Sequence, residues 1–452
     1  MTMYAPVRRR PVVLVVYRAP ASKSVEERAM GASALSSGPG PGELHRRLGT
    51  FDAVVIGLGS MIGAGIFAAL APAAARAGSG LLPALALAAV VAYCNATSSA
   101  RLAARYPLSG GTYVYGRERL GDFWGYLAGW SFVVGKTASC AAMALTVGAY
   151  AWPGREHAVA VAAVVVLTAV NCVGVRKSAW ATRVIVAVVL AVLAAVVTVC
   201  LTSGTARAAR LDLGADAGPG GVLQAAGLLF FAFAGYARVA TLGEEVRDPA
   251  RTIPRAIALA LGISLAVYAA VALGALAVLG PDRLAHATAP LADAVRAAGA
   301  PGLAPVVRAG AALAALGSLL SLILGVSRTT LAMARDRHLP HPLAAVHPRF
   351  GVPHRAELAV GAVVAALAAV VDVRGAIGFS SFGVLAYYAV ANASAWTLTP
   401  AEGRPPRIVP LAGAAGCLAL ALALPPASVV SGAAVVSLGA AVYALRRALT
   451  RS

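Results

Sequence analysis

The sequence predicts an all-α polytopic membrane protein with about twelve transmembrane helices. Hydrophobic residues make up 59% of the 452 residues, charged residues make up only 12%, and the mean hydropathy is +0.78. Soluble domains carry about 25% charged residues. A transmembrane helix needs about 20 mostly apolar residues. Twelve stretches of suitable character follow one another: 51–78, 81–103, 123–150, 157–174, 184–203, 219–242, 256–279, 304–328, 356–372, 376–398, 408–424 and 428–445.

Lysine and arginine are distributed unevenly between the loops that join these stretches. With the N-terminus placed inside, the inside segments hold 28 of the 38 basic residues and the outside segments hold 8. Cytoplasmic loops of membrane proteins carry an excess of Lys and Arg. We therefore expect a multi-pass protein of the cytoplasmic membrane with both termini inside. The net charge of +20 is then a topology signal, and we expect no nucleic-acid partner.

Glycine interrupts the first apolar stretch near its middle. Gly57, Gly59, Gly63 and Gly65 all lie within 51–78. A glycine in a helix interior costs roughly 1 kcal/mol relative to alanine, so this cluster favours a helix that opens. Non-helical backbone at membrane depth is tolerated only where it is buried in protein or lines a cavity. The interruption therefore predicts a binding site.

A second interruption falls in the sixth stretch, 219–242, at Phe231–Tyr236. Broken helices at corresponding positions of two halves are a sequence pointer to a transporter built from inverted repeats. The N-terminus of a half-helix presents N–H groups to an anion, and unwound carbonyls accept from a cation. An α-amino acid carries one group of each kind, so the two interruptions together favour an amino-acid site.

Four segments, in order along the chain, resemble the motifs of one transporter family. They are Gly59–Phe67; Tyr106–Tyr115 with Gly121 and Gly129-Trp130; Phe230–Pro254; and Ser327-Arg328 with Met333–Asp336 and Leu339-Pro340. The chain resembles the amino acid–polyamine–organocation permeases, most closely the amino-acid permease branch that includes the cationic amino acid transporters. The resemblance covers roughly residues 45–400.

The resemblance implies the leucine-transporter-type fold, with ten core helices in two inverted repeats over about 51–203 and 219–398. Broken helices one and six and two further peripheral helices belong to this fold. The expected regions are then a disordered cytoplasmic tail (1–44), the transport core (45–400), and helices 11 and 12 with a short cytoplasmic C-terminus (401–452). Met30 is an alternative start of translation.

The resemblance also implies where an amino acid binds. The N–H groups of Ala64 and Gly65 would hold its carboxylate, and the carbonyls of Met61, Phe231 and Ala234 would accept from its ammonium group. Phe231 would cover the substrate as a gate. Phe233 would be either a gating residue or an ordinary packing residue. The expected substrate-binding residues are Met61, Ile62, Gly63, Ala64, Gly65, Phe231 and Ala234.

Three positions depart from the family pattern, and all three concern coupling. Ala237 replaces an acidic residue common in helix six, Val189 replaces the helix-five lysine of proton-coupled relatives, and Arg101 replaces a glutamate. Lys136 lies in mid-membrane within 123–150, and an intramembrane charge is a functional hypothesis by default. We expect Lys136 to act either as a proton site or as a fixed cation; a structural lysine is the alternative.

Other polar residues are weaker candidates for coupling or gating. Ser318 and Ser321 could bind sodium, although hydroxyls in membrane helices more often bond between helices. Glu244 and Glu245 could form an inner-gate latch or an ordinary loop ion-pair network. We expect proton coupling in preference to sodium coupling. The histidines of the loop 329–355 do not have metal-site spacing, and no metal or cofactor is expected.

The function expected from these observations is secondary active transport of amino acids by alternating access. Spans one, three, six, eight and ten offer no acidic pocket residue, and a charged Lys136 would repel a cationic side chain, so a neutral substrate is favoured. The alternatives are a cationic amino acid or polyamine exchanger of the same fold, or a sensor or channel that does not perform coupled transport. A membrane enzyme is not expected because no HExxH, GxSxG or paired-carboxylate motif lies in a span. The sequence does not determine the oligomeric state.

Overall fold

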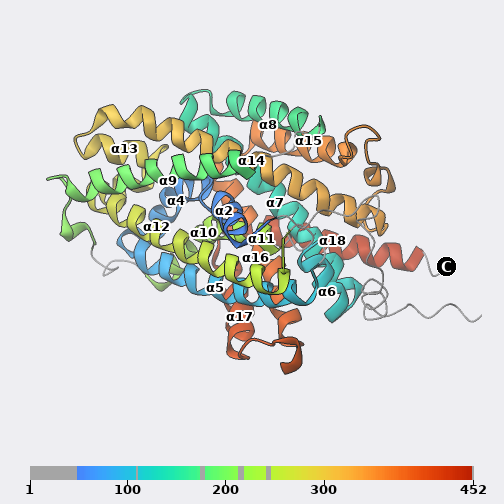
Figure 1. Cartoon of the computed structure of the whole chain (residues 1–452). Helices are drawn as coiled ribbons and strands as arrows, with labels where there is room; N and C mark the ends of the chain where they lie inside the picture. The colour runs from blue at the N-terminus through green and yellow to red at the C-terminus, as the bar shows by residue number, and fades with distance from the viewer. Residues whose placement is uncertain (1–47, 108–109, 174–178, 212–217, 241–245, 450–452) are drawn as a thin grey trace, which may run out of the picture. The chain divides into compact units, whose positions relative to one another are not determined.

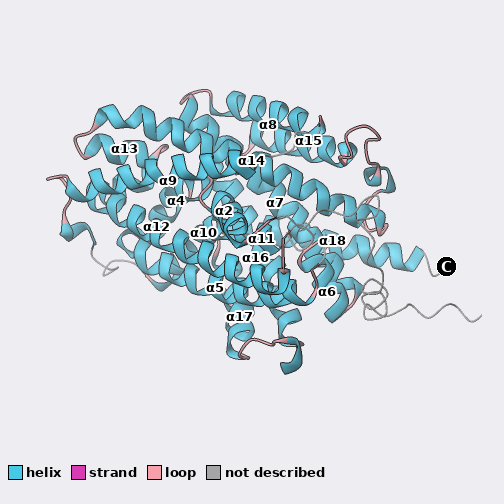
Figure 2. Ribbon diagram, viewed as in Figure 1, coloured by secondary structure: helices cyan, strands magenta, loops and turns pink. Residues whose placement is uncertain are grey.

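The computed structural model describes residues 48–107, 110–173, 179–211, 218–240 and 246–449. Every described residue belongs to one compact unit, Arg46–Ser452. The predicted tail and the candidate latch residues Glu244 and Glu245 lie outside the described residues. Within the described ranges the secondary structure is helical without any strand, apart from one isolated bridge between Leu48 and Val246 (Figure 2).

The helices follow one another in the order that the apolar stretches predict (Figure 1). They are α2 (Thr50–Met61), α3 (Ala64–Ala68), α4 (Leu70–Ala77), η1 (Gly78–Gly80), α5 (Leu81–Arg105), α6 (Thr112–Leu120), α7 (Asp122–Ala151), α8 (Glu156–Cys172), α9 (Ala179–Thr202), η2 (Ala208–Leu211), α10 (Pro219–Phe233), η3 (Ala234–Tyr236), α11 (Ala237–Ala240), α12 (Pro249–His286), α13 (Pro290–Ala297), η4 (Pro301–Leu303), α14 (Ala304–Arg335), η5 (His341–Ala344), α15 (His354–Val370), α16 (Val373–Trp396), η6 (Pro400–Glu402), α17 (Ile408–Ala423) and α18 (Pro426–Leu449).

Each of the twelve predicted spans coincides with one or more of these helices. Among the described residues, nine helical stretches are long and apolar enough to cross a membrane. The other three predicted spans are α8 and α15, with 17 residues each, and α17, with 16 residues. The prediction of an all-α polytopic membrane protein is confirmed, and so are the interruptions in the first and sixth spans, at Ile62-Gly63 and at η3.

Burial separates a central helix from peripheral ones. In an apolar 18-residue stretch of α7, 83% of the stretch is buried inside the protein. In the corresponding stretch of α18, only 17% is buried. α7 packs against α14 and α16, and α8 lies beside α15 at the edge of the bundle (Figure 1). α7 therefore lies at the centre of the bundle, where it can contact both broken helices.

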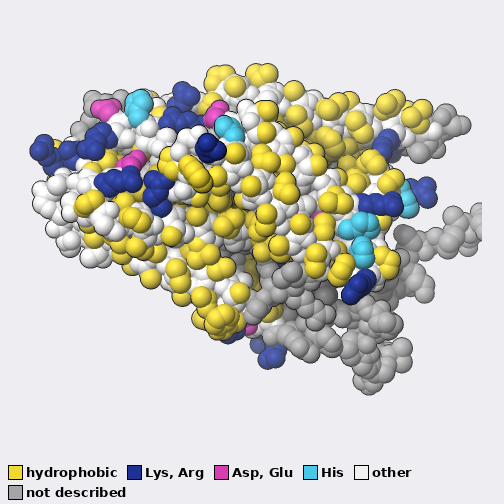
Figure 3. Space-filling view, turned by 90° about the horizontal axis from the view of Figure 1, so that it is seen from above, with side chains coloured by type: hydrophobic (Ala, Val, Ile, Leu, Met, Phe, Trp, Pro, Cys, Tyr) yellow, Lys and Arg dark blue, Asp and Glu magenta, His cyan; other side chains and the backbone are white. Residues whose placement is uncertain are grey.

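Hydrophobic side chains cover much of the outer surface. Figure 3 shows them across the middle of the visible face, with Lys and Arg gathered mainly toward its two ends. Leu422 and Val430 are each 70% exposed, on α17 and α18. Large exposed apolar patches mark contact with a partner or a membrane. Combined with the long apolar helices, this surface fits a protein surrounded by lipid.

Several glycines of the broken helices serve close packing. A Cβ added to Gly65 would lie 2.6 Å from the Cα of Ala232 on α10, and one added to Gly57 would lie 2.9 Å from a methyl of Val239. Gly235 of η3 faces the backbone of Ser60. Small residues let membrane helices approach closely. The glycines of the first span therefore let α2 approach α11 and α3 approach α10.

An ion-pair cluster holds the loop helix α6 against the segment that follows α16. Arg119 on α6 forms a two-pronged ion pair with Glu402 on η6, with N–O distances of 2.7 and 3.1 Å. The Thr399 N–H also donates to Glu402 at 2.9 Å. These hydrogen bonds, of which the one from Arg119 has the largest effect, lower the pKa of the Glu402 carboxyl to about 2. The contacts fix α6 relative to the end of α16.

Gly65→Ala should destabilise the protein by about 1–3 kcal/mol because its new methyl overlaps the α10 backbone. The matched control is Gly262→Ala on α12, where no heavy atom lies within 4 Å of the added Cβ. That control should be stabilised by about 0.5–1 kcal/mol through lower chain entropy. Thermal unfolding of the detergent-purified variants measures both effects, and equal midpoints for the two variants would contradict the close packing of Gly65.

Glu402→Gln should remove a pH-dependent contribution to stability of about 1 kcal/mol. The pKa of Glu402 is lower in the folded protein than its ordinary value of 4.5, so the carboxylate stabilises the fold above that value. The stabilisation is lost as the pH falls from about 4.5 towards 2. Unfolding midpoints measured from pH 7 to pH 3 should fall more steeply for the native protein than for the variant; parallel curves would contradict the assignment.

Candidate functional site

The first break leaves the start of α3 with uncapped backbone donors. α2 ends at Met61, and Ile62 (φ −81°, ψ 47°) and Gly63 (φ −99°, ψ −137°) leave the helical conformation before Ala64 begins α3. Among the described residues, no side chain caps this start. The first N–H groups of a helix have no partner within it, so Ala64 and Gly65 carry donors of the kind that the sequence predicts for a carboxylate.

The second break is tighter than the sequence predicts. α10 continues to Phe233, and the chain then makes one turn of 3₁₀ helix, η3, before α11 resumes the α-helix. Ala234 keeps near-helical angles (φ −65°, ψ 0°). The interruption is therefore a change of helical pitch, which frees few carbonyls, and not an extended unwound segment.

Tyrosine and serine side chains occupy the carbonyls near the first break. The hydroxyl of Tyr268 on α12 lies 2.5 Å from the Met61 carbonyl and 3.0 Å from the Ala232 carbonyl. Its single proton can serve one of them at a time. Ser318 on α14 donates to the Gly59 carbonyl at 2.9 Å. Side chains from α12 and α14 therefore replace the hydrogen bonds that α2 loses when it breaks.

Lys136 binds at the second break. Its ammonium nitrogen, buried on α7, donates to the Ala234 carbonyl at 3.1 Å. The Tyr388 hydroxyl on α16 also donates to this oxygen, at 3.4 Å. Ala234 is one of the carbonyls that the family resemblance assigns to the substrate ammonium group. In this structure a cation of the protein itself already occupies that position.

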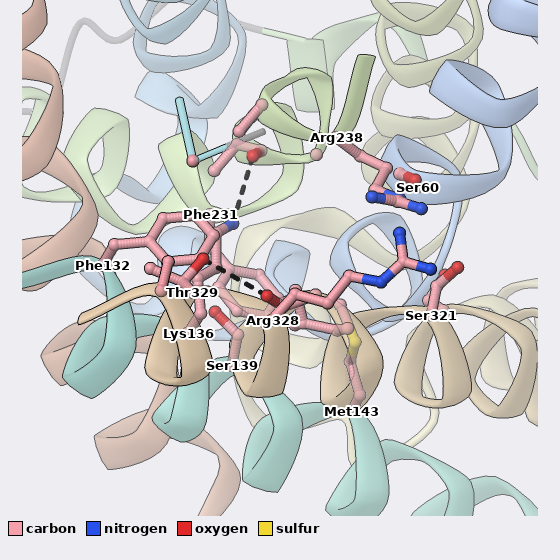
Figure 4. Close-up of a pocket in the computed structure, with 18 residues that line it drawn as sticks. Ser60, Phe132, Lys136, Ser139, Met143, Phe231, Arg238, Ser321, Arg328 and Thr329 are labelled. Atoms are coloured by element: carbon pink, nitrogen blue, oxygen red, sulfur yellow. Dashed lines mark hydrogen bonds between the residues drawn. The ribbon is translucent and has the colours of Figure 1, made fainter. Parts of the chain in front are cut away.

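A cavity lies between the two breaks and is bounded by α7, α10, η3, α11 and α14 (Figure 4). Five of the predicted site residues line it: Lys136, Phe231, Ala234, Ser318 and Ser321. A neighbouring cavity, lined by α2, α9 and α14, includes Ile62 and shares Ser60, Arg238, Ser318 and Ser321 with the first. The structure thus brings together residues from segments that are far apart in the sequence.

The other predicted site residues that the structure describes pack nearby without lining either cavity. Gly63 faces the Ser318 side chain, and Gly65 packs on Ala232. Phe233 is fully buried, and its ring lies edge-on to that of Tyr268 at 5.1 Å. Met61 and Ala64 are also buried. Of the two roles considered for Phe233, gate or packing residue, its position in this structure is that of a packing residue.

Comparison with known proteins matches this arrangement to a family. The amino acid permease family model matches residues 52–402, which include both breaks and all the helices that line the cavity. The chain belongs to the amino acid permease family. The predicted resemblance is confirmed, and the protein is a transporter of the amino acid permease type.

Individual relatives extend this match. An uncharacterized transporter of Mycobacterium tuberculosis is 75% identical over 411 residues, which cover 91% of this permease and 93% of that protein. The branched-chain amino acid permease BcaP of Bacillus subtilis is 26% identical, over 81% of this chain and 84% of its own. Cationic amino acid transporter 4 of Homo sapiens is 29% identical, over 80% of this chain and 61% of its own.

Two arginines of the permease cavity were not among the predicted site residues. Arg238 on α11 and Arg328 on α14 both line it, and Figure 4 shows their guanidinium groups turned toward each other, beside Ser60 and Ser321. Arg238 could have been found because a charge within a membrane helix is expensive. Arg328 is the last residue of the predicted span 304–328, and α14 continues past it to Arg335, so that Arg328 lies in the cavity wall.

Two of the three departures from the family pattern lie in these same cavities. Ala237, where many relatives carry an acidic residue, lines the first cavity, and Val189, the position of the helix-five lysine, lines the second. Lys136 lies on another helix but also reaches the first cavity. One buried charge lies elsewhere: Glu357 on α15 is fully buried and is not among the residues that line either cavity.

The cavity extends along one half of α14. Its lining on that helix runs from Ser318 to Ala332, toward the C-terminal end. Toward the other end, the Tyr150 hydroxyl donates to the Phe67 carbonyl at 3.0 Å and accepts from the Leu291 N–H at 3.5 Å. These bonds join α3, α7 and α13. They lie beside the end of α14 that the lining of the cavity does not reach.

Tyr268→Phe should lower stability by about 1–3 kcal/mol because it leaves a buried carbonyl without its donor. The matched control is Tyr93→Phe, which removes a hydroxyl from a side chain that is 58% exposed on α5. Thermal unfolding of the two purified variants tests this. Equal stability of Tyr268→Phe and Tyr93→Phe would show that the Met61 and Ala232 carbonyls do not depend on the hydroxyl.

Proposed function

We propose that this permease is a secondary active transporter that moves amino acids across the cytoplasmic membrane by alternating access. The observation that carries the proposal is the cavity between the breaks of two membrane helices, in a chain that belongs to the amino acid permease family. Relatives named for branched-chain and for cationic amino acids support an amino acid as the transported molecule.

The site in this proposal combines backbone and side-chain groups. The uncapped N–H groups of Ala64 and Gly65 are the candidates for the substrate carboxylate. Phe231, buried at the cavity wall, is the candidate gate. The carbonyls of Met61 and Ala234 already accept from Tyr268 and Lys136. A substrate ammonium group at either carbonyl would therefore have to displace or share a protein donor.

In this proposal the cavity belongs to one state of an alternating-access cycle. With both termini inside, as the loop charges predict, the C-terminal end of α14 faces the cytoplasm. The cavity then leads inward, and the Tyr150 contacts with Phe67 and Leu291 close the outward path. Movement between this state and an outward-facing one requires these contacts to open.

Coupling in this proposal centres on Lys136. The side chain is 5% exposed, reaches the cavity and holds the Ala234 carbonyl of the broken helix. The ammonium group of Lys136 can release a proton, and loss of that proton would weaken this bond. Protonation of Lys136 could in this way control η3. Ser318 is already bonded to Gly59, which weakens the case for a helix-eight sodium site.

Uptake of radiolabelled amino acids into proteoliposomes tests the proposed function. Saturable, stereoselective counterflow of at least one amino acid is the expected result. Conductance that does not saturate would instead identify a channel, and binding without counterflow would identify a sensor. Stereoselective exchange of polyamines alone would favour the exchanger alternative.

Lys136→Met should abolish the pH dependence of uptake if Lys136 is the proton site. Lys136→Arg, which stays charged at every accessible pH, separates the two roles: it should also lose pH dependence if the lysine carries a proton, and should keep native behaviour if only a fixed cation is needed. Uptake from pH 5.5 to 8.5, with thermal unfolding as the folding control, measures both variants. Native pH dependence in Lys136→Met would exclude the proton role.

A further inference from the structure

The first turn of α15 carries a carboxyl group that the proposed transport mechanism does not use. Glu357 is fully buried, and neither of its side-chain oxygens has a hydrogen-bond partner in the part of the chain that the structure describes. An ionised carboxylate that is buried without partners is so costly that the group takes up a proton instead. Glu357 is therefore expected to be a neutral acid in this state of the permease.

The packing of α8 on α15 places this carboxyl between two helices. Thr168 of α8 faces Gly361 of α15, because a Cβ added to Gly361 would lie 2.5 Å from the Thr168 hydroxyl oxygen. Residues four apart lie on one face of a helix. Cys172, four residues after Thr168, accordingly lies beside Glu357, four residues before Gly361. The carboxyl belongs to the packed face of α15 and not to its outer face.

The ionisable groups around Glu357 are few. The elements α7, α8, α14 and η5 pack against α15. Among their described residues, two ionisable side chains interact with the carboxyl: the Cys172 thiol at the end of α8, which is a weak donor, and the Arg328 guanidinium on α14. On α15 itself, His354 lies one turn before Glu357, with its ring edge-on to that of His347 at 5.3 Å.

Arg328 connects this carboxyl to the cavity. It lines the cavity between the two breaks, and it also makes other interactions in the protein. A charged Glu357 would attract Arg328 and compete with those interactions, whereas a neutral Glu357 would not. The protonation state of Glu357 would in this way be felt by a residue of the cavity wall, although Glu357 does not line that wall.

We propose that Glu357 is a proton-binding site, and that release of its proton engages Arg328 and strengthens the hold of α15 on α14. The proton would pass between the carboxyl and water at the end of the bundle where α8 ends and α15 begins. Cys172 is partly exposed there and Arg355 is exposed. The inference goes beyond the proposed function, in which coupling centres on Lys136, and rests on it only for the effect on transport.

Difference infrared spectroscopy of the purified permease tests the proton directly. A protonated carboxylic acid has a carbonyl stretch that is separate from the bands of carboxylates and amides. The native protein should show this band at pH 6, where an exposed glutamate has already lost its proton, and should lose most of it by pH 9. Absence of the band at pH 6, or its persistence unchanged at pH 9, would overturn the inference.

Variants assign the band to one residue. Glu357→Gln cannot bind the proton and should lack the band, and Glu357→Met provides a second variant without an ionisable group. The matched control is Glu118→Gln on α6, which removes an exposed carboxyl and should keep the band. Lys136→Met should also keep it. Thermal unfolding identifies the folded variants, and a native band in either folded Glu357 variant would exclude Glu357 as its source.

Counterflow in proteoliposomes tests the effect on transport, with the same pH on both sides. The rate of Glu357→Gln divided by the native rate should rise by at least about threefold between pH 6 and pH 9, because only the native carboxyl can ionise, engage Arg328 and slow the movement of α14. Lys136 is present in both proteins, so its own titration cancels from this ratio. The corresponding ratio for Glu118→Gln should stay constant.

The two measurements fail in different ways. A constant Glu357→Gln ratio, together with the expected infrared band, would overturn the link to Arg328 and to transport. Absence of counterflow in the native protein for all twenty amino acids would overturn the proposed function and leave the infrared test of the proton site in force.

Discussion

The backbone hydrogen bonds that two membrane helices lose where they break constrain most of this structure. A polar backbone group in a lipid-surrounded bundle has no water to bond to, and each unsatisfied group costs several kcal/mol. α2 breaks at Ile62-Gly63, and its carbonyls receive donors from Tyr268 and Ser318. α12 and α14 must therefore pack against the break. The position of the break thus determines which helices surround the cavity.

At the second break, a charged side chain donates to a carbonyl of the interrupted helix. Lys136 and Tyr388 reach the Ala234 carbonyl from α7 and α16, on either side of the sixth span. A lysine in this role ties the central helix α7 to the broken sixth span. Its charge is part of the bond, so any change in its protonation would alter how η3 is held. Structure and coupling would then depend on one side chain.

The cavity between the breaks takes its charged groups from separate helices. Lys136 lies on α7, Arg238 on α11 and Arg328 on α14, and all three line the cavity together with Phe231 and Ala234 of the sixth span. In the proposed function, side chains of this cavity would distinguish one amino acid from another. Relatives in the comparisons are named for branched-chain and for cationic amino acids.

Composition and hydropathy alone determined that the chain is an all-α membrane protein. The glycines at Gly59–Gly65 and the Phe231–Tyr236 segment located both breaks, because helix propensity and membrane burial are local properties. Tertiary structure alone decided that Lys136 meets Ala234 and that Arg238 faces Arg328. These partners lie about 90 residues or more apart. Their meeting depends on how helices pack, which no local pattern in the sequence records.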